Sequence, residues 1–219
     1  MLDAGTNLSF WKRGLVLIPD EVWDRTDLET LVLADNELTH VPEQLGRLKN
    51  LRMLDLGHNR LTSVPEALGE LEALTDFLYL HDNKLRTLPS SIARLQRLKY
   101  LNISQNSFDT LPDPVTRMTS LVELRASDNQ MTSLSDSIDR LSKLRELDLR
   151  NNRLTSLPIA IGNLANLRQL DLRGNPLAGL PESIADLPRL EKLDLRWVDT
   201  LPLPRWILEL EERGCLVYR

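Results

Sequence analysis

The side chains best suited to chemistry in this sequence are three histidines and a single cysteine. His58 and His81 lie 23 positions apart, and Asp55 and Asp82 are close to them in the sequence. Two imidazoles and a carboxylate can hold a metal ion. The two histidines, however, occupy adjacent rather than equivalent positions of the repeat described below. We therefore expect no metal site and no cofactor, and we interpret the pair as exposed residues at a sheet edge.

Nucleophilic catalysis requires a nucleophile and a base close together. The only cysteine, Cys215, is near the end of the chain, whereas His40 follows a turn near its beginning. Neither of the phosphate-binding patterns G-x-x-x-x-G-K-[ST] and G-x-G-x-x-G occurs. The sequence therefore predicts that the protein is not an enzyme, and that Cys215 is a small buried residue in a capping strand.

A repeat of 23 residues must position all of these side chains. The chain has 219 residues, of which 49 are leucine. Its units have the form L-x-x-L-x-L-x-x-N-x-L and open at Leu28, Leu51, Leu74, Leu98, Leu121, Leu144, Leu167 and Leu190. The unit that opens at Leu74 is one residue longer than the others, and we expect a local bulge there.

Each unit predicts a short strand, a turn and a short helix. The turn contains an asparagine whose buried amide should bind backbone groups that the turn leaves unpaired. These asparagines, to which we assign a structural role, are Asn36, Asn59, Asn83, Asn106, Asn129, Asn152 and Asn175. A proline, replaced once by Ser135, then precedes apolar residues spaced three apart, such as Leu45 and Leu48, which is typical of one helix face.

No single unit can bury its own apolar face, so the units must stack. The sequence predicts an α/β solenoid, a right-handed horseshoe with a concave parallel sheet of about eight or nine short strands and short helices or turns on the convex side. We expect one structural domain with three parts. Residues 1–27 form a degenerate N-terminal repeat and cap, residues 28–189 form seven repeats, and residues 190–219 form a partial repeat and a helical cap.

Large aromatic residues near both ends are expected to cover the terminal layers. We assign this capping role to Trp23 and Trp206. The second of them lies in an expected helix over residues 205–213, which Gly214 should end.

This pattern resembles the leucine-rich repeat family, in its form L-x-x-L-x-L-x-x-N-x-L-x-x-L-P-x-x-I-G-x-L-x-x-L, over roughly residues 8–202. Within that family it is most similar to plant Ras-group-related proteins, the repeats of animal Ras scaffolds and bacterial leucine-rich effectors. The resemblance implies a horseshoe that binds a protein and performs no catalysis. It does not identify the partner.

Composition narrows the choice of partner and compartment. A formal net charge of −5 argues against nucleic acid and against an anionic membrane surface. No segment has the ~18 consecutive apolar residues of a membrane span, and residues 1–7 lack the pattern of a secretory leader. One cysteine cannot form an internal disulfide. We therefore expect a cytoplasmic protein, in its own cytosol or in that of a host if it is a delivered effector.

The residues between the strand leucines point outward on the concave face and are not dictated by packing. They predict an aromatic zone in the N-terminal half and a charged zone in the C-terminal half, where Asp148, Asp171 and Asp194 lie beside arginines. That charged zone either pairs with itself or receives acidic side chains of a partner. The candidate binding residues are Val32, Met53, Phe77, Tyr79, His81, Tyr100, Asn102, Arg125, Arg150, Arg173, Arg196 and Trp197.

We therefore predict a monomeric, non-catalytic module that binds another protein on its concave face, with Phe77, Tyr79 and Tyr100 as anchors. Two alternatives remain. The protein could be a regulatory or inhibitory subunit, or a secreted effector, that blocks or scaffolds a signalling enzyme or small GTPase. It could also be a structural repeat protein that associates with itself.

Overall fold

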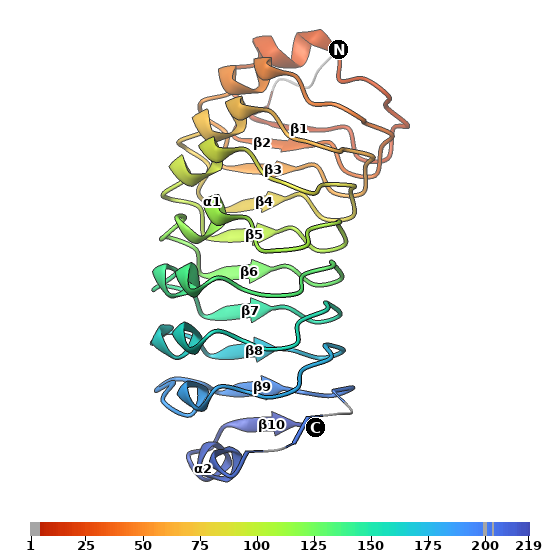
Figure 1. The fold of residues 1–219 in the computed structure, drawn as a ribbon. Coiled ribbons are helices and arrows are strands. Elements are labelled where there is room, and N and C mark those ends of the chain that lie inside the picture. The colour runs from red at the N-terminus through yellow and green to blue at the C-terminus, as the bar shows by residue number, and fades with distance from the viewer. Residues whose placement is uncertain (1–4, 199–200, 203) are drawn as a thin grey trace.

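The computed structural model describes residues 5–198, 201–202 and 204–219, so residues 1–4 of the segment searched for a leader lie outside it. In the described part, ten strands form one parallel sheet and follow each other in chain order, with the two chain ends at opposite ends of the stack (Figure 1). The predicted α/β solenoid is confirmed. The strands are β1 (Asn7–Ser9), β2 (Thr30–Val32), β3 (Met53–Asp55), β4 (Phe77–Tyr79), β5 (Tyr100–Asn102), β6 (Glu123–Arg125), β7 (Glu146–Asp148), β8 (Gln169–Asp171), β9 (Lys192–Asp194) and β10 (Leu216–Tyr218).

The sheet exceeds the expected eight or nine strands because the C-terminal segment adds β10. Val217 of β10 pairs with Leu193 of β9 in parallel register. The sequence of β10 lacks the leucine pattern of the repeats, which is why the repeat alone did not predict a strand in the sheet at this point.

Each strand is three residues long, and its middle residue points into the core. The middle residues of β2 to β9 are leucines and are fully buried or nearly so. The residues on either side of them point away from the helices. We call the surface that these outward residues form the sheet face; it is the surface that the repeat pattern predicts to be concave.

Short helices run along the other side of the stack (Figure 1). All but two are 3₁₀-helices: η1 (Asp20–Asp24), η2 (Glu43–Arg47), η3 (Glu66–Glu70), η4 (Ser90–Arg94), η5 (Asp136–Arg140), η6 (Ile159–Asn163) and η7 (Glu182–Ile184), with α1 (Asp113–Thr116) and α2 (Trp206–Glu212) as the α-helices. A proline directly precedes η1 to η4, η6, η7 and α1 and fixes the entry of the chain. Ser135 replaces it before η5, where its side chain accepts a hydrogen bond from the Ser137 amide at 3.2 Å.

Two glycines allow neighbouring helices to approach each other closely. A Cβ atom on Gly69 would lie 2.2 Å from the carbonyl oxygen of Ser91, and one on Gly162 would lie 2.4 Å from that of Ser183. Any other residue at these positions would force the helices apart. The Ser91 hydroxyl fastens the same contact by donating a hydrogen bond to the carbonyl of Glu66 at 2.6 Å.

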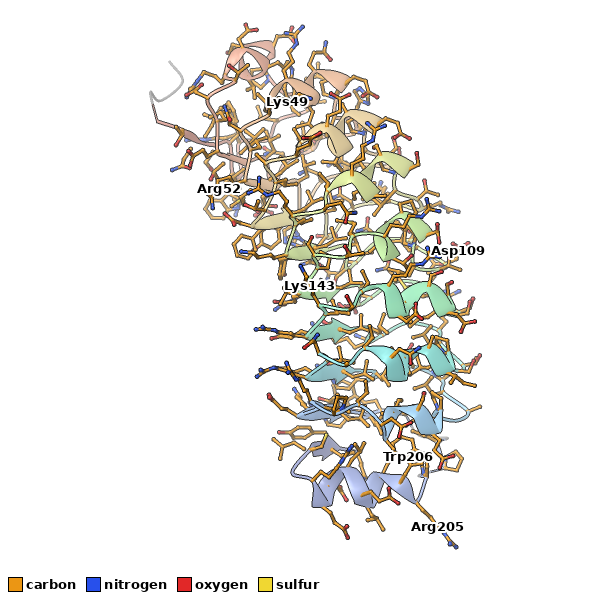
Figure 2. All side chains as sticks on the ribbon, turned by 90° about the vertical axis from the view of Figure 1, so that its left-hand side faces the viewer. Lys49, Arg52, Asp109, Lys143, Arg205 and Trp206 are labelled. Atoms are coloured by element: carbon orange, nitrogen blue, oxygen red, sulfur yellow. The ribbon has the colours of Figure 1, made fainter. Side chains whose placement is uncertain are left out.

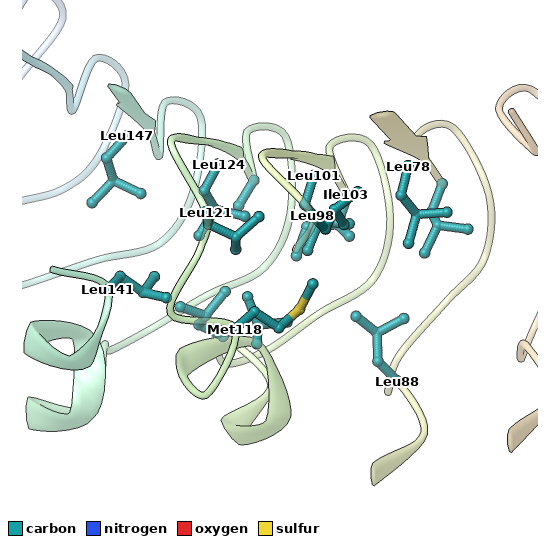
Figure 3. Close-up of a cluster of buried hydrophobic side chains, with 14 of the residues drawn as sticks. Leu78, Leu88, Leu98, Leu101, Ile103, Met118, Leu121, Leu124, Leu141 and Leu147 are labelled. Atoms are coloured by element: carbon teal, nitrogen blue, oxygen red, sulfur yellow. The ribbon is translucent and has the colours of Figure 1, made fainter. Parts of the chain in front are cut away.

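The core is a continuous layer of leucine side chains between the strands and the helices. Figure 3 shows strand residues such as Leu101 and Leu124 above residues from the helical side such as Met118 and Leu141. All four are fully buried. Because burial of one such side chain is worth about 1.5–3 kcal/mol, the stack as a whole depends on this layer.

The longer unit keeps the strand register intact. Met53 of β3 pairs with Phe77 of β4, as the equivalent residues do in regular units. The extra residue lies before the strand, where the amide of Asp76 donates to the carbonyl of Arg52 at 3.0 Å. The bulge is therefore confined to the approach to β4, and the outward residues of that strand stay aligned with those of their neighbours.

Aromatic residues close both ends of the core, as the sequence predicts. Trp23 in η1 and Trp206 in α2 are both buried, and Figure 2 shows Trp206 and Arg205 at the C-terminal end of the stack. Helix α2 ends before Gly214, whose φ of +90° favours glycine.

Cys215 follows α2 and is buried, in agreement with its predicted role. Its amide donates to the carbonyl of Leu210 at 3.0 Å, and burial raises the pKa of its thiol. None of the helices in the described residues has the length and apolar character needed to cross a membrane.

Candidate functional site

The repeat asparagines fix the direction in which the chain leaves each strand. Asn59 is buried, and its Nδ2 donates to the carbonyls of Leu33, Leu56 and Gly57 at 3.0 to 3.1 Å. Its Oδ1 accepts from the amide of Leu38 at 3.0 Å. The same four-contact pattern, within the unit and to the preceding unit, occurs at Asn36, Asn83, Asn106, Asn129, Asn152 and Asn175.

The residue before most of these asparagines has a left-handed backbone, with φ between +50° and +57° at Asp35, His58, Asp82, Gln105, Asp128 and Asn151. Trp197 occupies the equivalent position of the last unit, with a φ of +60°. It therefore lies in the turn at the edge of the sheet face. The residue is 67% exposed, and its ring lies 5.8 Å from the guanidinium carbon of Arg173 and 6.0 Å from that of Arg196.

Three aromatic residues from β4 and β5 meet on the sheet face. We call Phe77, Tyr79 and Tyr100 the aromatic cluster. The ring centre of Phe77 lies 5.8 Å from that of Tyr79 and 5.3 Å from that of Tyr100, and the two tyrosine rings are 5.1 Å apart. The guanidinium carbon of Arg125 lies 5.5 Å from the centre of the Tyr100 ring. These distances are typical of attractive aromatic and cation–π contacts.

The members of the aromatic cluster differ in accessibility. Phe77 is 41% exposed and Tyr79 is half-buried, whereas Tyr100 is only 8% exposed. Burial raises the pKa of Tyr100 to about 12, and burial also raises the pKa of Tyr79. Phe77 and Tyr79 therefore form the accessible surface, and Tyr100 supports it from below.

Three further candidates lie on β2, β3 and β5. Val32 and Met53 are half-buried, and Met53 is the register neighbour of Phe77. Asn102 is buried although it belongs to the outward set, and its Oδ1 accepts a hydrogen bond from the amide of Ser104 at 3.0 Å. This contact gives Asn102 a role in shaping the strand exit.

The two histidines of the sheet edge are in contact. Their ring centres are 4.7 Å apart, and Nδ1 of His58 lies 2.5 Å from a carboxylate oxygen of Asp82. The His81 ring lies over Gly57, where a Cβ atom would be 2.3 Å from the ring. Burial lowers the pKa of His81. Among the described residues, no group of three or more His, Cys, Asp or Glu side chains is arranged to hold a metal ion.

In the C-terminal half, arginines and aspartates of the sheet face pair within their own units. We call Asp148, Asp171, Asp194, Arg150, Arg173 and Arg196 the charged ladder. A guanidinium nitrogen of Arg173 lies 2.6 Å from Asp171, one of Arg196 lies 2.8 Å from Asp194, and one of Arg150 lies 3.3 Å from Asp148. This is the self-paired arrangement of the two that the sequence left open.

The carboxylates of the charged ladder lie in unequal surroundings. The Asp194 side chain is 0% exposed. Burial alone would raise its pKa, but hydrogen bonds from Arg196 and the charge of Arg173 hold the pKa of Asp194 below its usual value. For Asp148 burial outweighs the nearby charge of Arg150, and its pKa is raised.

A hollow of about 240 Å³ lies on the sheet face over β6 to β9. It adjoins the aromatic cluster, since β6 is the neighbour of β5. Its lining residues are Glu123, Leu124, Arg125, Glu146, Leu147, Asp148, Arg150, Gln169, Leu170, Asp171 and Lys192. Glu123, Glu146 and Gln169 are not among the candidate binding residues predicted from the sequence. Each of the three occupies the first outward position of its strand, in register with Tyr100. This shared position is the sequence signal by which they could have been found.

Family models match most of the chain. A model described as "Leucine rich repeat" matches residues 26–85 and 76–131, and one described as "Leucine-rich repeat region" matches residues 132–212. A search of curated proteins found no match.

Three solved structures illustrate the likeness. A leucine-rich repeat protein of Leptospira interrogans is 28% identical with a TM-score of 0.75, and the alignment covers 94% of this chain and 64% of that one. The ectodomain of the Arabidopsis thaliana receptor kinase GASSHO1/SCHENGEN3, solved with CASPARIAN STRIP INTEGRITY FACTOR 2, is 35% identical with a TM-score of 0.72 over 81% of this chain and 22% of that one. The repeat domain of the type III effector XopL is 22% identical with a TM-score of 0.80, over 98% and 76% of the two chains, and shows the shared fold. This chain thus spans under two thirds of the first two proteins.

Proposed function

Because the chain belongs to the leucine-rich repeat family, whose domains are general protein-interaction modules, we propose that it binds another protein through its sheet face. The similar plant ectodomain, which was solved with a bound factor, supports a binding role. In this proposal the protein is a monomer and acts by binding alone.

The observation that carries the proposal is the accessible part of the aromatic cluster. Packing does not require aromatic side chains there, because the leucine between them, Leu78, already fills the core. Phe77 nevertheless leaves 41% of its surface in water. Exposed, pre-packed aromatic side chains surrounded by polar groups are typical of the residues that dominate binding energy at protein interfaces.

Tyr100 and Arg125 stabilise this surface from the side of β5 and β6. Tyr100 contacts both accessible rings, and Arg125 covers the outer face of Tyr100. A salt bridge from Arg125 to Glu123 at 2.6 Å holds the guanidinium in that place. Because the rings are already ordered, fixing them when a partner binds costs little conformational entropy.

Site-directed photo-cross-linking tests the proposal. A photoreactive benzoylphenylalanine replaces Phe77 in one variant and Ile159 in a control variant, since Ile159 is 76% exposed but lies in η6 on the helical side. After irradiation in a lysate of the source cells, we expect a defined cross-linked partner from position 77 and none from position 159. A partner captured only from position 159 would contradict binding through the sheet face.

The same experiment addresses self-association. A cross-link between two copies of the chain from position 77, with a mass by light scattering that doubles with concentration, would show that the partner is the protein itself. A constant monomer mass together with a foreign cross-linked protein supports the proposal as stated.

A further inference from the structure

One carboxylate in the hollow over β6 to β9 lacks a partner. Glu146 is the first residue of β7 and is half-buried. Within the described residues its side chain makes no hydrogen bond or salt bridge. Its register neighbours are Glu123 on β6 and Gln169 on β8, so neither side offers it a cation.

The cations of the hollow are already engaged elsewhere. Arg125 pairs with Glu123 at 2.6 Å, and Arg150 lies 3.3 Å from Asp148. Lys192 lies 3.9 Å from Asp194 of its own strand, β9, a carboxylate that Arg196 also holds at 2.8 Å.

The remaining carboxylate of the lining, that of Asp171, is held by Arg173. Among the side chains that line the hollow, four carboxylates (Glu123, Glu146, Asp148 and Asp171) face three cations (Arg125, Arg150 and Lys192). Glu146 and the exposed amide of Gln169 are the two polar groups of the first outward position that remain free to accept hydrogen bonds from a ligand.

We infer that the hollow receives a lysine or arginine side chain of the partner, which pairs with Glu146 while a neighbouring apolar side chain of the same segment packs on Phe77 and Tyr79. The inference rests on the proposed function and specifies the chemistry of the partner. A cation that leaves water for this hollow gains a charge-assisted hydrogen bond and relieves the excess of negative charge.

The geometry also sets a spacing. Phe77 lies on β4 and Glu146 on β7, three strands away, which corresponds to about 14 Å at the usual strand separation. An extended segment that crosses the strands covers this distance in about four residues, and residues four apart in an extended chain point to the same side. The partner segment should therefore carry an aromatic or aliphatic residue and a basic residue four positions apart.

Selection from a random library of displayed 12-residue peptides tests the inference. On the wild-type protein, we expect peptides enriched in an apolar residue and a lysine or arginine four positions apart. On Glu146→Gln the enrichment of the basic residue should disappear while that of the apolar residue persists. A selected peptide should bind Glu146→Gln about tenfold more weakly and the control Glu182→Gln, altered at an exposed position on the helical side, with unchanged affinity.

Charge reversal provides a second, independent readout. A selected peptide whose basic residue is replaced by glutamate should lose affinity for the wild type and regain it on Glu146→Lys. Peptides that need Phe77 but bind Glu146→Gln as well as wild type, or that lack a basic residue, would overturn the inference and leave the proposed function intact. Peptides that bind Phe77→Ala/Tyr79→Ala at full affinity would overturn the proposed function, and a library that yields no binder on the wild type would overturn the inference.

Discussion

The aromatic cluster and the charged ladder lie on the same sheet face and on strands of the same kind. They differ in how many of their interactions are already made within the chain. In the charged ladder, each arginine is bound by the aspartate two residues before it. In the aromatic cluster the rings contact each other, but Phe77 keeps much of its surface in water. The ladder therefore has most of its interactions completed within the chain, whereas the aromatic cluster has apolar surface left to bury.

This difference separates stability from binding. A charged side chain contributes little to the affinity for another protein when its ion pair within the chain must first be broken. Burial of apolar surface by the other protein, in contrast, is favourable because it removes that surface from water. We expect the charged ladder to influence folding more than binding, and the aromatic cluster to influence binding more than folding. The following predictions test that separation.

The largest expected effect is on the free energy of unfolding and comes from the asparagines beneath both regions. It should be similar in the two regions. Asn106→Ala, below the aromatic cluster, and Asn175→Ala, below the charged ladder, each remove four buried hydrogen bonds and leave one buried amide, that of Leu85 or Leu154, without its acceptor. We expect each to lower the free energy of unfolding in urea by about 3 kcal/mol. Asn163→Ala, at an exposed position, is the control. Markedly unequal losses would mean that the two regions do not share one scaffold.

The second-largest expected effect is on binding affinity, and it should differ between the two regions. Phe77→Ala should weaken binding of the cross-linked partner or of a selected peptide by about 30-fold, equivalent to about 2 kcal/mol, because it removes an interface anchor. Its cost in stability should be about 1 kcal/mol or less, since the ring is partly exposed. Arg173→Ala should leave the affinity nearly unchanged.

Calorimetric titration and urea unfolding of the same samples measure both quantities. If Arg173→Ala weakens binding as much as Phe77→Ala does, the charged ladder is part of the interface and the contrast between the regions fails.

The sequence predicts the scaffold well because packing dictates it. The 23-residue period, the asparagines and the prolines each correspond to one physical demand, and the strands and helices appear where these residues place them. The capping strand that the sequence predicts around Cys215 is present as β10. Its pairing with β9 as a tenth strand of the sheet was not predicted, because Leu216, Val217 and Tyr218 lack the repeat pattern.

The surface is predicted less well because it depends on side-chain contacts between units. The sequence places Tyr100 and Asn102 on the outward side, but it does not show that neighbouring rings cover the first or that the second binds the Ser104 amide. The choice between a self-paired and an open charged ladder depends on arginine conformations, which the pattern leaves undetermined. The unpartnered state of Glu146 becomes evident only when every neighbouring ion pair is known.

A smaller effect should show how the charged ladder contributes to stability. Asp194→Asn removes a buried charge that three cations surround, and we expect a loss of about 1–2 kcal/mol at neutral pH. Because the folded protein lowers the pKa of Asp194, its contribution is present above the ordinary aspartate pKa of about 4 and is lost as the pH falls below it.

Urea unfolding of wild type and variant between pH 7 and pH 3 measures this contribution. The two stability curves should converge at low pH, whereas the exposed control Asp186→Asn should follow the wild type throughout. A difference that persists unchanged at the lowest pH would assign the effect to packing instead of charge.

The smallest effect should appear beside the aromatic cluster and in a different pH range. Burial lowers the pKa of His81, whose ring contacts Tyr79 and covers Gly57. The unfolded chain therefore binds a proton more readily than the folded one, so stability should decline slightly as the pH falls below the ordinary histidine pKa of about 6.5.

The NMR signal of the His81 ring, assigned by its absence in His81→Gln, should titrate below that value. If so, acid acts on His81 of the aromatic region first and on Asp194 of the charged ladder only below about pH 4, and these two sites of one sheet face can be perturbed separately. A His81 signal that titrates at or above 6.5 would place the ring in water and remove that separation.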